Sequence, residues 1–323
     1  MKHVVLPLLF AGLLATADAA NIVRAEGSAD TMGTVFSVVA WGEDRGRLES
    51  AVAGALDEAR RLDEMLSNYR QASELSEVNR LAAKEPVRVS DELFGLLQAC
   101  SEYSRASEGT FDITVGPLMK VWGFYRGTGH LPKEQEIRAA LDRVGYRKVV
   151  LDGKTRTVRF STDGVELDPG GIGKGYAVDR MIAVLKESGV DSALVSAGSS
   201  SIYALGTPPD EPGWQVAIRD PRDETKSVAT VTLRDQSLST SGNYEKFFVA
   251  DGKVWSHIMD PRTGYPAMGT LSVSIVSPRT IDSEAWAKPC FILGRKWTAR
   301  HKQKDFRVFF CEDKADSPCA WLQ

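Results

Sequence analysis

The segment Asp168-Pro-Gly-Gly-Ile-Gly-Lys-Gly-Tyr-Ala-Val-Asp179 carries the densest local signal in the chain. Its four glycines let the backbone approach another group closely, and a helical pattern follows until Gly189. The N–H groups and positive dipole end of such a helix favour an anion, to which Lys174 adds a full positive charge. The segment therefore predicts either a phosphate-binding turn or only a tight connection into a helix.

The same segment differs from the established nucleotide-binding loops. Asp168 stands at the first glycine position of a Walker loop, and Gly175 replaces the Ser or Thr that would bind magnesium. The segment does not fit G-x-G-x-x-G either. The chain also lacks H-E-x-x-H and G-x-S-x-G, which argues against a zinc protease and an α/β-hydrolase.

The composition indicates a globular protein. Its 323 residues are 43% hydrophobic and 26% charged, which is enough for one large core or two adjoining cores. Forty basic against 43 acidic side chains give a net charge of −3, so no basic excess exists to bind nucleic acid through its phosphates. The only long apolar run is N-terminal, which excludes a polytopic membrane protein.

The N-terminus has the pattern of a secretory signal peptide. Lys2 and His3 precede the apolar stretch 4–15, and Ala17-Asp18-Ala19 supplies the small residues of a cleavage site. The apolar stretch is too short to span a bilayer. We expect residues 1–19 to be removed, which leaves a periplasmic domain of residues 20–323 with no membrane span; a retained N-terminal helix is the alternative.

Export permits disulfides, and the chain has four cysteines. Cys311 and Cys319 flank a polar segment near the C-terminus, and they either form a disulfide or stay free. Cys100 and Cys290 lie in apolar stretches, which predicts buried thiols.

The periodicity of apolar residues predicts helices mainly in the first half of the chain and strands in the second. Helices are expected over 48–66, over 132–145, over 174–188 and after Ser90, which can cap a helix. Short strands are expected at 35–41, 149–151, 157–160, 193–196, 214–219, 229–233, 247–250, 254–257 and 272–276. Because helices and strands are segregated, the predicted fold class is α+β, with antiparallel sheets flanked by helices.

A second polar cluster, Ser256–Gly264, contains His257 at the end of a predicted strand. A lone histidine in this position is either a structural residue or a catalytic base. The segments 109–117 and 239–245 are polar loops that indicate no chemistry by themselves.

Taken together and in order, six motifs resemble the FAD:protein FMN transferases, the ApbE-type flavin transferases. They are Met32-Gly-Thr34, Leu66-Ser-Asn-Tyr69, Gly109–Pro117, Asp168–Asp179, Thr240-Ser-Gly242 and His257–Gly264, within a resemblance that extends over about Thr31 to Gly294. The resemblance implies an α+β fold with an FAD cleft, and an exported enzyme that uses magnesium. Such an enzyme splits the FAD pyrophosphate, attaches FMN to a Thr or Ser of an exported or membrane-anchored partner protein, and releases AMP.

The resemblance also implies roles for individual residues. Positions that contact FAD in the family correspond to Met32, Tyr69, Thr110, Phe111, Asp112, Asp168, Lys174 and Ile258. Gly171 corresponds to a metal site that uses a main-chain carbonyl, and His257 would deprotonate the acceptor hydroxyl. The pyrophosphate would rest on the amide hydrogens of Gly171–Gly175.

Two segments depart from the family. Where the family has Ala-Asp-x-x-x-Thr, whose Asp and Thr hold the metal, this chain has Ser283-Glu284-Ala-Trp-Ala-Lys288. Glu284 keeps an oxygen ligand, whereas a protonated Lys288 cannot bind a metal and either replaces the cation at the pyrophosphate or pairs with Glu284. The segment 197–201 stands where the family tends to have Asn-x-Gly-Gly.

The sequence is compatible with three functions. A flavin transferase is the leading hypothesis, with His257 and Lys288 as catalytic residues and with Gly171 and Glu284 as metal ligands. The alternatives are a hydrolase that splits FAD into FMN and AMP, and a non-catalytic FAD carrier or maturation factor.

Overall fold

The computed structural model describes residues 22–127, 129–314 and 317–322. The predicted signal peptide, residues 1–19, therefore lies outside the described residues. No helix in the described ranges combines the length and the apolar character that a membrane crossing requires.

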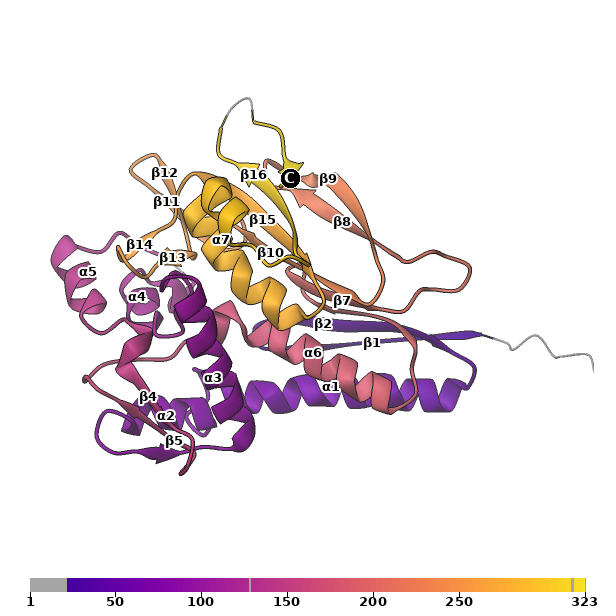
Figure 1. Ribbon diagram of the computed structural model, residues 1–323, viewed down its shortest axis with the longest axis horizontal. Helices are drawn as coiled ribbons and strands as arrows, with labels where there is room; N and C mark the ends of the chain where they lie inside the picture. The colour runs from indigo at the N-terminus through magenta and orange to yellow at the C-terminus, as the bar shows by residue number, and fades with distance from the viewer. Residues whose placement is uncertain (1–21, 128, 315–316, 323) are drawn as a thin grey trace, which may run out of the picture.

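An eight-stranded sheet forms the centre of the molecule (Figure 1). Every neighbouring pair of its strands is antiparallel, as the sequence predicts. In their order across the sheet the strands are β1 (Val23–Thr31), β2 (Thr34–Gly42), β6 (Ser192–Ala197), β7 (Ser201–Leu205), β10 (Gln236–Gly242), β15 (Thr270–Ser277), β16 (Arg307–Glu312) and β17 (Ala320–Trp321).

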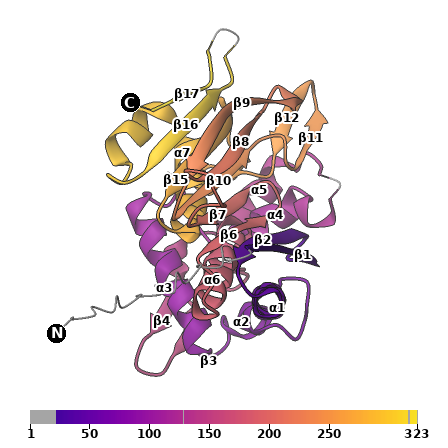
Figure 2. The same ribbon diagram turned by 90° about the vertical axis from the view of Figure 1, so that its right-hand side faces the viewer.

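Three long helices cover one face of this sheet: α1 (Arg45–Leu66), α6 (Gly173–Glu187) and α7 (Thr280–His301) (Figures 1 and 2). The apolar stripe of α1, from Leu48 to Leu66, is buried against β1, β2 and α6, which confirms the predicted helix. The hairpin β8 (Trp214–Asp220) and β9 (Asp223–Leu233) packs a separate apolar cluster on the opposite face. The sheet is therefore covered on both sides.

The remaining elements form a smaller lobe and two hairpins beside the sheet (Figure 1). A three-stranded sheet carries helix α3 (Asp91–Ala106), whose first turn is capped by Ser90 through its hydroxyl, as expected. The other elements are α2 (Glu74–Leu81), β3 (Val87–Arg88), α4 (Gly116–Val121), α5 (Glu134–Leu141), β4 (Val149–Asp152), β5 (Thr157–Phe160), β11 (Phe247–Ala250), β12 (Lys253–Ser256), β13 (Met259–Asp260) and β14 (Tyr265–Pro266), with short 3₁₀ turns η1 (Phe124–Arg126), η2 (Tyr146–Lys148) and η3 (Pro169–Gly171).

The structure also answers the questions about cysteines. Cys311 and Cys319 form a disulfide that links β16 to the segment before β17. Cys100 and Cys290 are free and buried, as predicted. Burial raises the pKa of the Cys290 thiol to about 12, so neither its position nor its chemistry suggests a reactive thiolate.

Candidate functional site

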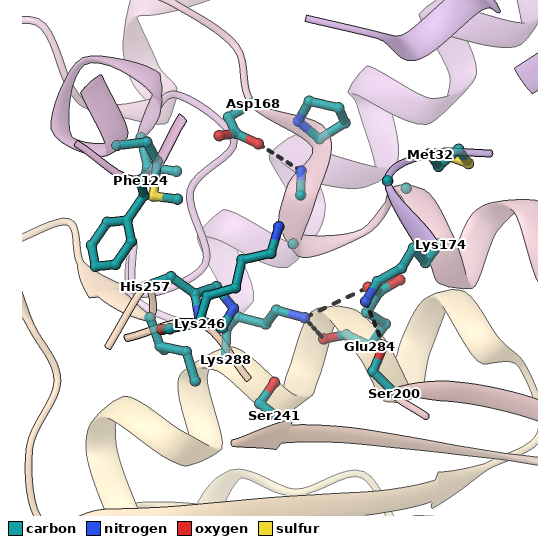
Figure 3. A pocket seen from close by; sticks show the side chains of 18 of the residues that line it. Met32, Phe124, Asp168, Lys174, Ser200, Ser241, Lys246, His257, Glu284 and Lys288 are labelled. Atoms are coloured by element: carbon teal, nitrogen blue, oxygen red, sulfur yellow. Dashed lines mark hydrogen bonds and ion pairs between the residues drawn. The ribbon is translucent and has the colours of Figure 1, made fainter. Parts of the chain in front are cut away.

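One cavity of about 530 Å³ lies where the glycine-rich segment meets α7, the β12–β13 connection and the loop after α3. All the residues that the sequence analysis assigned to FAD, to the metal or to catalysis line it. They are Tyr69, Thr110, Phe111, Asp112, Gly171 and Ile258, together with Met32, Asp168, Lys174, His257, Glu284 and Lys288, which Figure 3 labels. Segments far apart in the sequence thus meet in one place, although their individual roles stay predictions.

The glycine-rich segment forms one wall of the cavity. Asp168 caps the turn η3 by accepting the N–H of Gly170 at 2.7 Å. Helix α6 begins at Gly173, and among the described residues the N–H groups of Gly173 and Lys174 have no protein acceptor. These two groups and the helix dipole can receive an anion.

Gly175 behaves differently from the prediction that its amide faces a phosphate. Its N–H donates to Glu284 Oε2 of α7. A Cβ at this position would lie 2.6 Å from the Thr280 carbonyl oxygen and 2.7 Å from Glu284 Oε2. The glycine is therefore needed for the close approach of α6 to α7, and Glu284 takes one of the N–H groups expected to hold the pyrophosphate.

Three lysines point into the cavity from different elements (Figure 3). Lys174 donates to the hydroxyl of Ser200, in the segment that departs from the family pattern. Lys288 donates to the main-chain oxygen of Glu284 at 3.2 Å, and burial lowers the pKa of Lys288 to about 8. Lys246 reaches in from the connection between β10 and β11. Three ammonium groups therefore face the cavity, which the carboxylates of Asp63, Asp112, Asp168, Glu245 and Glu284 also line.

His257 follows β12 and is half-buried. Its Nδ1 lies 3.1 Å from the Lys246 carbonyl oxygen, which favours the tautomer with the proton on Nδ1 and leaves Nε2 free to accept one. Burial, together with the charges of Lys288, Lys246 and Lys174, lowers the pKa of His257 to about 4. The imidazole is therefore neutral at physiological pH.

The Thr110–Asp112 stretch contributes less side-chain chemistry than the sequence suggests. Thr110 donates its hydroxyl to the Ser107 carbonyl oxygen at 2.7 Å. The Asp112 carboxylate accepts from both the N–H and the hydroxyl of Thr114, and from the N–H of Tyr146. These contacts fix the loop, so the stretch shapes the wall of the cavity through its backbone and through Phe111.

Two aromatic rings stand at the rim. Tyr69, which is 74% exposed, lies edge to face with Tyr125, and their ring centroids are 5.9 Å apart. The Tyr125 hydroxyl donates to Asp168 at 2.8 Å and accepts from the Asn68 amide at 3.3 Å. The side-chain oxygen of Asn68 is buried and has no hydrogen-bond donor among the described residues. The rim thus offers a ring for stacking and an acceptor for a ligand N–H.

The turn between β1 and β2 also lines the cavity, through Met32 and Gly33. Met32 and Gly33 both have positive φ, 50° and 70°, as a tight two-residue hairpin requires. The Met32 methyl group lies 3.2 Å from where a Cβ on Gly173 would be, so the absence of a side chain at Gly173 gives Met32 its place in the wall.

The lining residues to which sequence reasoning assigned no role include Asn68, Tyr125, Ser200 and Lys246. Asn68 and Ser200 lie inside the quoted segments 66–69 and 197–201, Lys246 directly follows 239–245, and Tyr125 lies in the short turn η1, so none belongs to a stretch with a clear period. Proximity to a motif was the available signal, and the loop packing that turns these side chains inward was not readable from it.

Comparison with known proteins gives a consistent result. Residues 32–310 match the ApbE family. The chain is 34% identical over 264 residues to an FAD:protein FMN transferase of Klebsiella pneumoniae, with 80% of each chain covered. It is 36% identical over 245 residues to one of Treponema pallidum, with 71% of this chain and 67% of the relative covered.

Solved structures that are similar to this chain also belong to ApbE proteins. The ApbE protein of Thermotoga maritima superposes with a TM-score of 0.83 at 28% identity, over 90% of this chain and 95% of that chain. The flavin transferase ApbE of Vibrio cholerae gives a TM-score of 0.78 at 26% identity, over 94% of this chain and 96% of that chain. The α+β fold predicted from the sequence is confirmed.

Proposed function

Since this chain belongs to the ApbE family, we propose that it is an FAD:protein FMN transferase that joins FMN to a Thr or Ser of an acceptor protein and releases AMP. The observation that carries the proposal is the convergence of all the predicted FAD-contacting and catalytic residues on one cavity. Its three lysines and the N-terminus of α6 suit a pyrophosphate, and its aromatic rim suits a flavin ring.

The reaction is a phosphoryl transfer. The acceptor hydroxyl oxygen attacks the phosphorus on the FMN side of FAD, and the bond from that phosphorus to the bridging oxygen breaks. AMP leaves with the bridging oxygen, and the hydroxyl proton goes to His257 Nε2, which the contact from Nδ1 to Lys246 leaves free. The α6 N-terminus and Lys174 face the charge that develops on the phosphoryl oxygens.

The resemblance implies magnesium, held by the Gly171 carbonyl and Glu284, but the residues present do not fit that ion. Glu284 Oε2 accepts the N–H of Gly175, and the Lys288 ammonium lies 3.8 Å from Oε1. A cation bound there would be repelled by that ammonium at close range. The described residues also contain no group of three His, Cys, Asp or Glu that could hold a metal. We therefore derive no step through magnesium.

We further propose that the protein works in the periplasm on an exported or membrane-anchored acceptor. The signal-peptide pattern of residues 1–19 and the disulfide between Cys311 and Cys319 support this, since disulfides persist in oxidising compartments. Fractionation of cells followed by mass spectrometry of the N-terminus tests it. A periplasmic protein that begins at residue 20 is expected, and an uncleaved cytosolic protein would contradict the proposal.

The activity test uses the purified mature protein, FAD and the envelope protein fraction of the same cells. We expect AMP in solution and a flavin-fluorescent protein band that survives denaturing electrophoresis. His257→Gln should reduce both by at least about 100-fold, in the range for loss of a general base. AMP without a fluorescent band would instead indicate an FAD hydrolase, and intact FAD bound to the protein would indicate a carrier.

A further inference from the structure

One turn of α7 places an ammonium group beside the glycine-rich segment (Figure 3). The side chain of Lys288 is 22% exposed and lines the cavity, four residues after Glu284 on the same helix. A Cβ built on Gly171 would lie 3.7 Å from Lys288 Cε. The lysine stem therefore runs past the residue whose carbonyl was expected to bind a metal.

Glu284 does not occupy all the N–H donors of the Lys288 ammonium. Lys288 Nζ lies 3.8 Å from Glu284 Oε1, which is longer than a hydrogen bond. In the part of the chain that the structure describes, its one hydrogen bond goes to the Glu284 main-chain oxygen. Since an ammonium has three N–H donors, two remain for a ligand.

The charges around Lys288 also favour an anion over a cation. The carboxylate of Glu284, 3% exposed, lies between Lys288 and the first turn of α6, where it accepts the N–H of Gly175. Lys174 adds a second ammonium on the same side of the cavity, and Lys246 points in from the opposite wall. Two ammonium groups and one carboxylate leave a net positive charge beside a helix N-terminus.

From this geometry we propose that the Lys288 ammonium stands in for a divalent cation at the FAD pyrophosphate, so that this chain binds and cleaves FAD without magnesium. The inference rests on the proposed function and assigns Lys288 a direct contact with the substrate. The bonds that form and break are those of the transfer described above, and Lys288 neutralises charge on the non-bridging oxygens without giving up its proton.

The test measures FAD binding by isothermal titration, once with EDTA and once with MgCl2. For the unaltered protein we expect the two dissociation constants to agree within about twofold. Lys288→Met should weaken binding at least about tenfold in both buffers, since a charge-assisted contact is lost, and Lys288→Arg should retain most of the affinity. Lys288→Thr should bind weakly with EDTA and regain affinity with MgCl2, because it opens space and supplies an oxygen ligand.

Two controls separate substrate contact from structural effects. Lys296→Met removes an exposed lysine from the same helix and should leave FAD affinity unchanged. Thermal unfolding of each variant shows whether it is folded. If Lys288→Met bound FAD like the unaltered protein and only unfolded earlier, Lys288 would be a structural partner of Glu284 and the inference would be overturned.

The remaining outcomes distinguish this inference from the proposed function. Should MgCl2 tighten FAD binding by the unaltered protein tenfold or more, or EDTA abolish AMP release, metal replacement is wrong while flavin transfer stands. Should the unaltered protein bind no FAD in either buffer, the proposed function fails, and that result needs no lysine variant to be recognised.

Discussion

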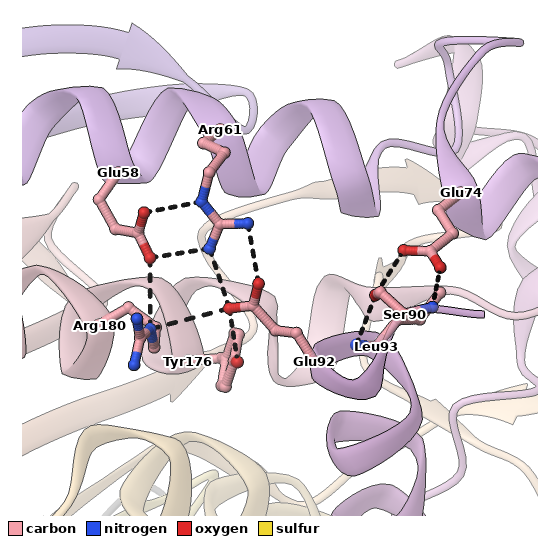
Figure 4. Close-up of polar contacts among 8 residues, drawn as sticks. All are labelled: Glu58, Arg61, Glu74, Ser90, Glu92, Leu93, Tyr176 and Arg180. Carbon is pink, nitrogen blue, oxygen red and sulfur yellow. Dashed lines mark hydrogen bonds and ion pairs between the residues drawn. The ribbon is translucent and has the colours of Figure 1, made fainter. Parts of the chain in front are cut away.

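Helix α6 carries two clusters of charged side chains that are assembled in opposite ways. The outer cluster, on the side facing α1 and α3, consists of Glu58, Arg61, Glu92, Tyr176 and Arg180 (Figure 4). Every charge in it has an opposite partner: Arg61 contacts both carboxylates, at 2.7 and 2.8 Å, and Arg180 lies 3.2 Å from one of them.

The cavity cluster, at the N-terminus of α6, consists of Lys174, Glu284 and Lys288. Here the one carboxylate lies 3.8 Å from the Lys288 ammonium and also accepts a main-chain N–H, while Lys174 donates to the Ser200 hydroxyl instead. The first two turns of α6 thus carry one cluster with balanced charge on the side facing α1 and α3, and one cluster with two ammonium groups and a single carboxylate on the side facing the cavity, which suits a ligand. The contrast separates residues that stabilise the fold from residues held ready for substrate.

The largest expected effect on stability comes from disrupting the close contact between α6 and α7 at Gly175, which holds the cavity cluster together. In Gly175→Ala the new methyl group meets the Thr280 carbonyl oxygen at 2.6 Å, so the backbones of α6 and α7 must separate. We expect a loss of about 3 kcal/mol in the free energy of unfolding, measured by urea denaturation. Gly95→Ala in α3, where a Cβ meets nothing within 4 Å, should be neutral or stabilising by up to about 1 kcal/mol.

If both glycine variants behaved alike, the close approach of α6 to α7 would not be what positions Glu284. If Gly175→Ala unfolded early while equivalent substitutions near the outer cluster did not, the tight packing would be specific to the cavity end.

A smaller effect is expected from the pKa of His257, which burial and the neighbouring lysines lower to about 4. The folded protein takes up a proton at His257 less readily than the unfolded chain, whose histidines titrate near pH 6.5. The stability that this neutral histidine contributes is therefore present above about pH 6.5 and is lost as the pH falls toward 4.

Denaturant titrations at several pH values measure this difference. Between pH 7 and pH 4 the unaltered protein should lose on the order of 1 kcal/mol more than His257→Gln, because solvent screens the half-buried ring. In an NMR titration, Lys246→Met should raise the pKa of His257, since one nearby positive charge is gone. An unshifted histidine with a pKa near 6.5 would show that neither burial nor the neighbouring lysines act on the imidazole as described.

The sequence predicted much of the site because its residues lie in long collinear motifs, and it predicted α1 because one face of that helix is apolar throughout. It did not predict α7. Pro289 interrupts the hydrogen-bond pattern of that helix, Gly294 has a φ of 73° within it, and buried residues lie on several of its sides. A segment with mixed burial and internal helix breakers has no clear period to detect.

The sequence did not predict strand β1 either, for a different reason. Its inward positions include Ala25 and Ala29, which are small, and a Cβ on Gly27 would lie 2.9 Å from the side chains of Val52 and Leu56. Small residues are needed because α1 packs directly on the strand, so the alternation of apolar and polar residues is weak. The requirement is tertiary and does not appear in the local sequence.

The smallest effect belongs to the outer cluster. Arg61→Met leaves Glu58 and Glu92 without their shared partner, although Arg180 still contacts Glu58. Hydrogen bonding to Arg61 lowers the pKa of Glu58, so the loss should appear at neutral pH and vanish on acidification. Because these side chains are partly exposed, we expect a decrease of about 1 kcal/mol or less in the free energy of unfolding, with no change in FAD affinity.

Arg60→Met is the matched control, since Arg60 is the preceding residue on α1 and, within the described ranges, forms its one ion pair with the exposed Asp57. It should leave both stability and FAD affinity unchanged. A loss of FAD affinity in Arg61→Met as large as in Lys288→Met would contradict the distinction between a structural outer cluster and a ligand-binding cavity cluster. An effect on stability alone would support it, because balanced charges then act on folding and unbalanced ones on the substrate.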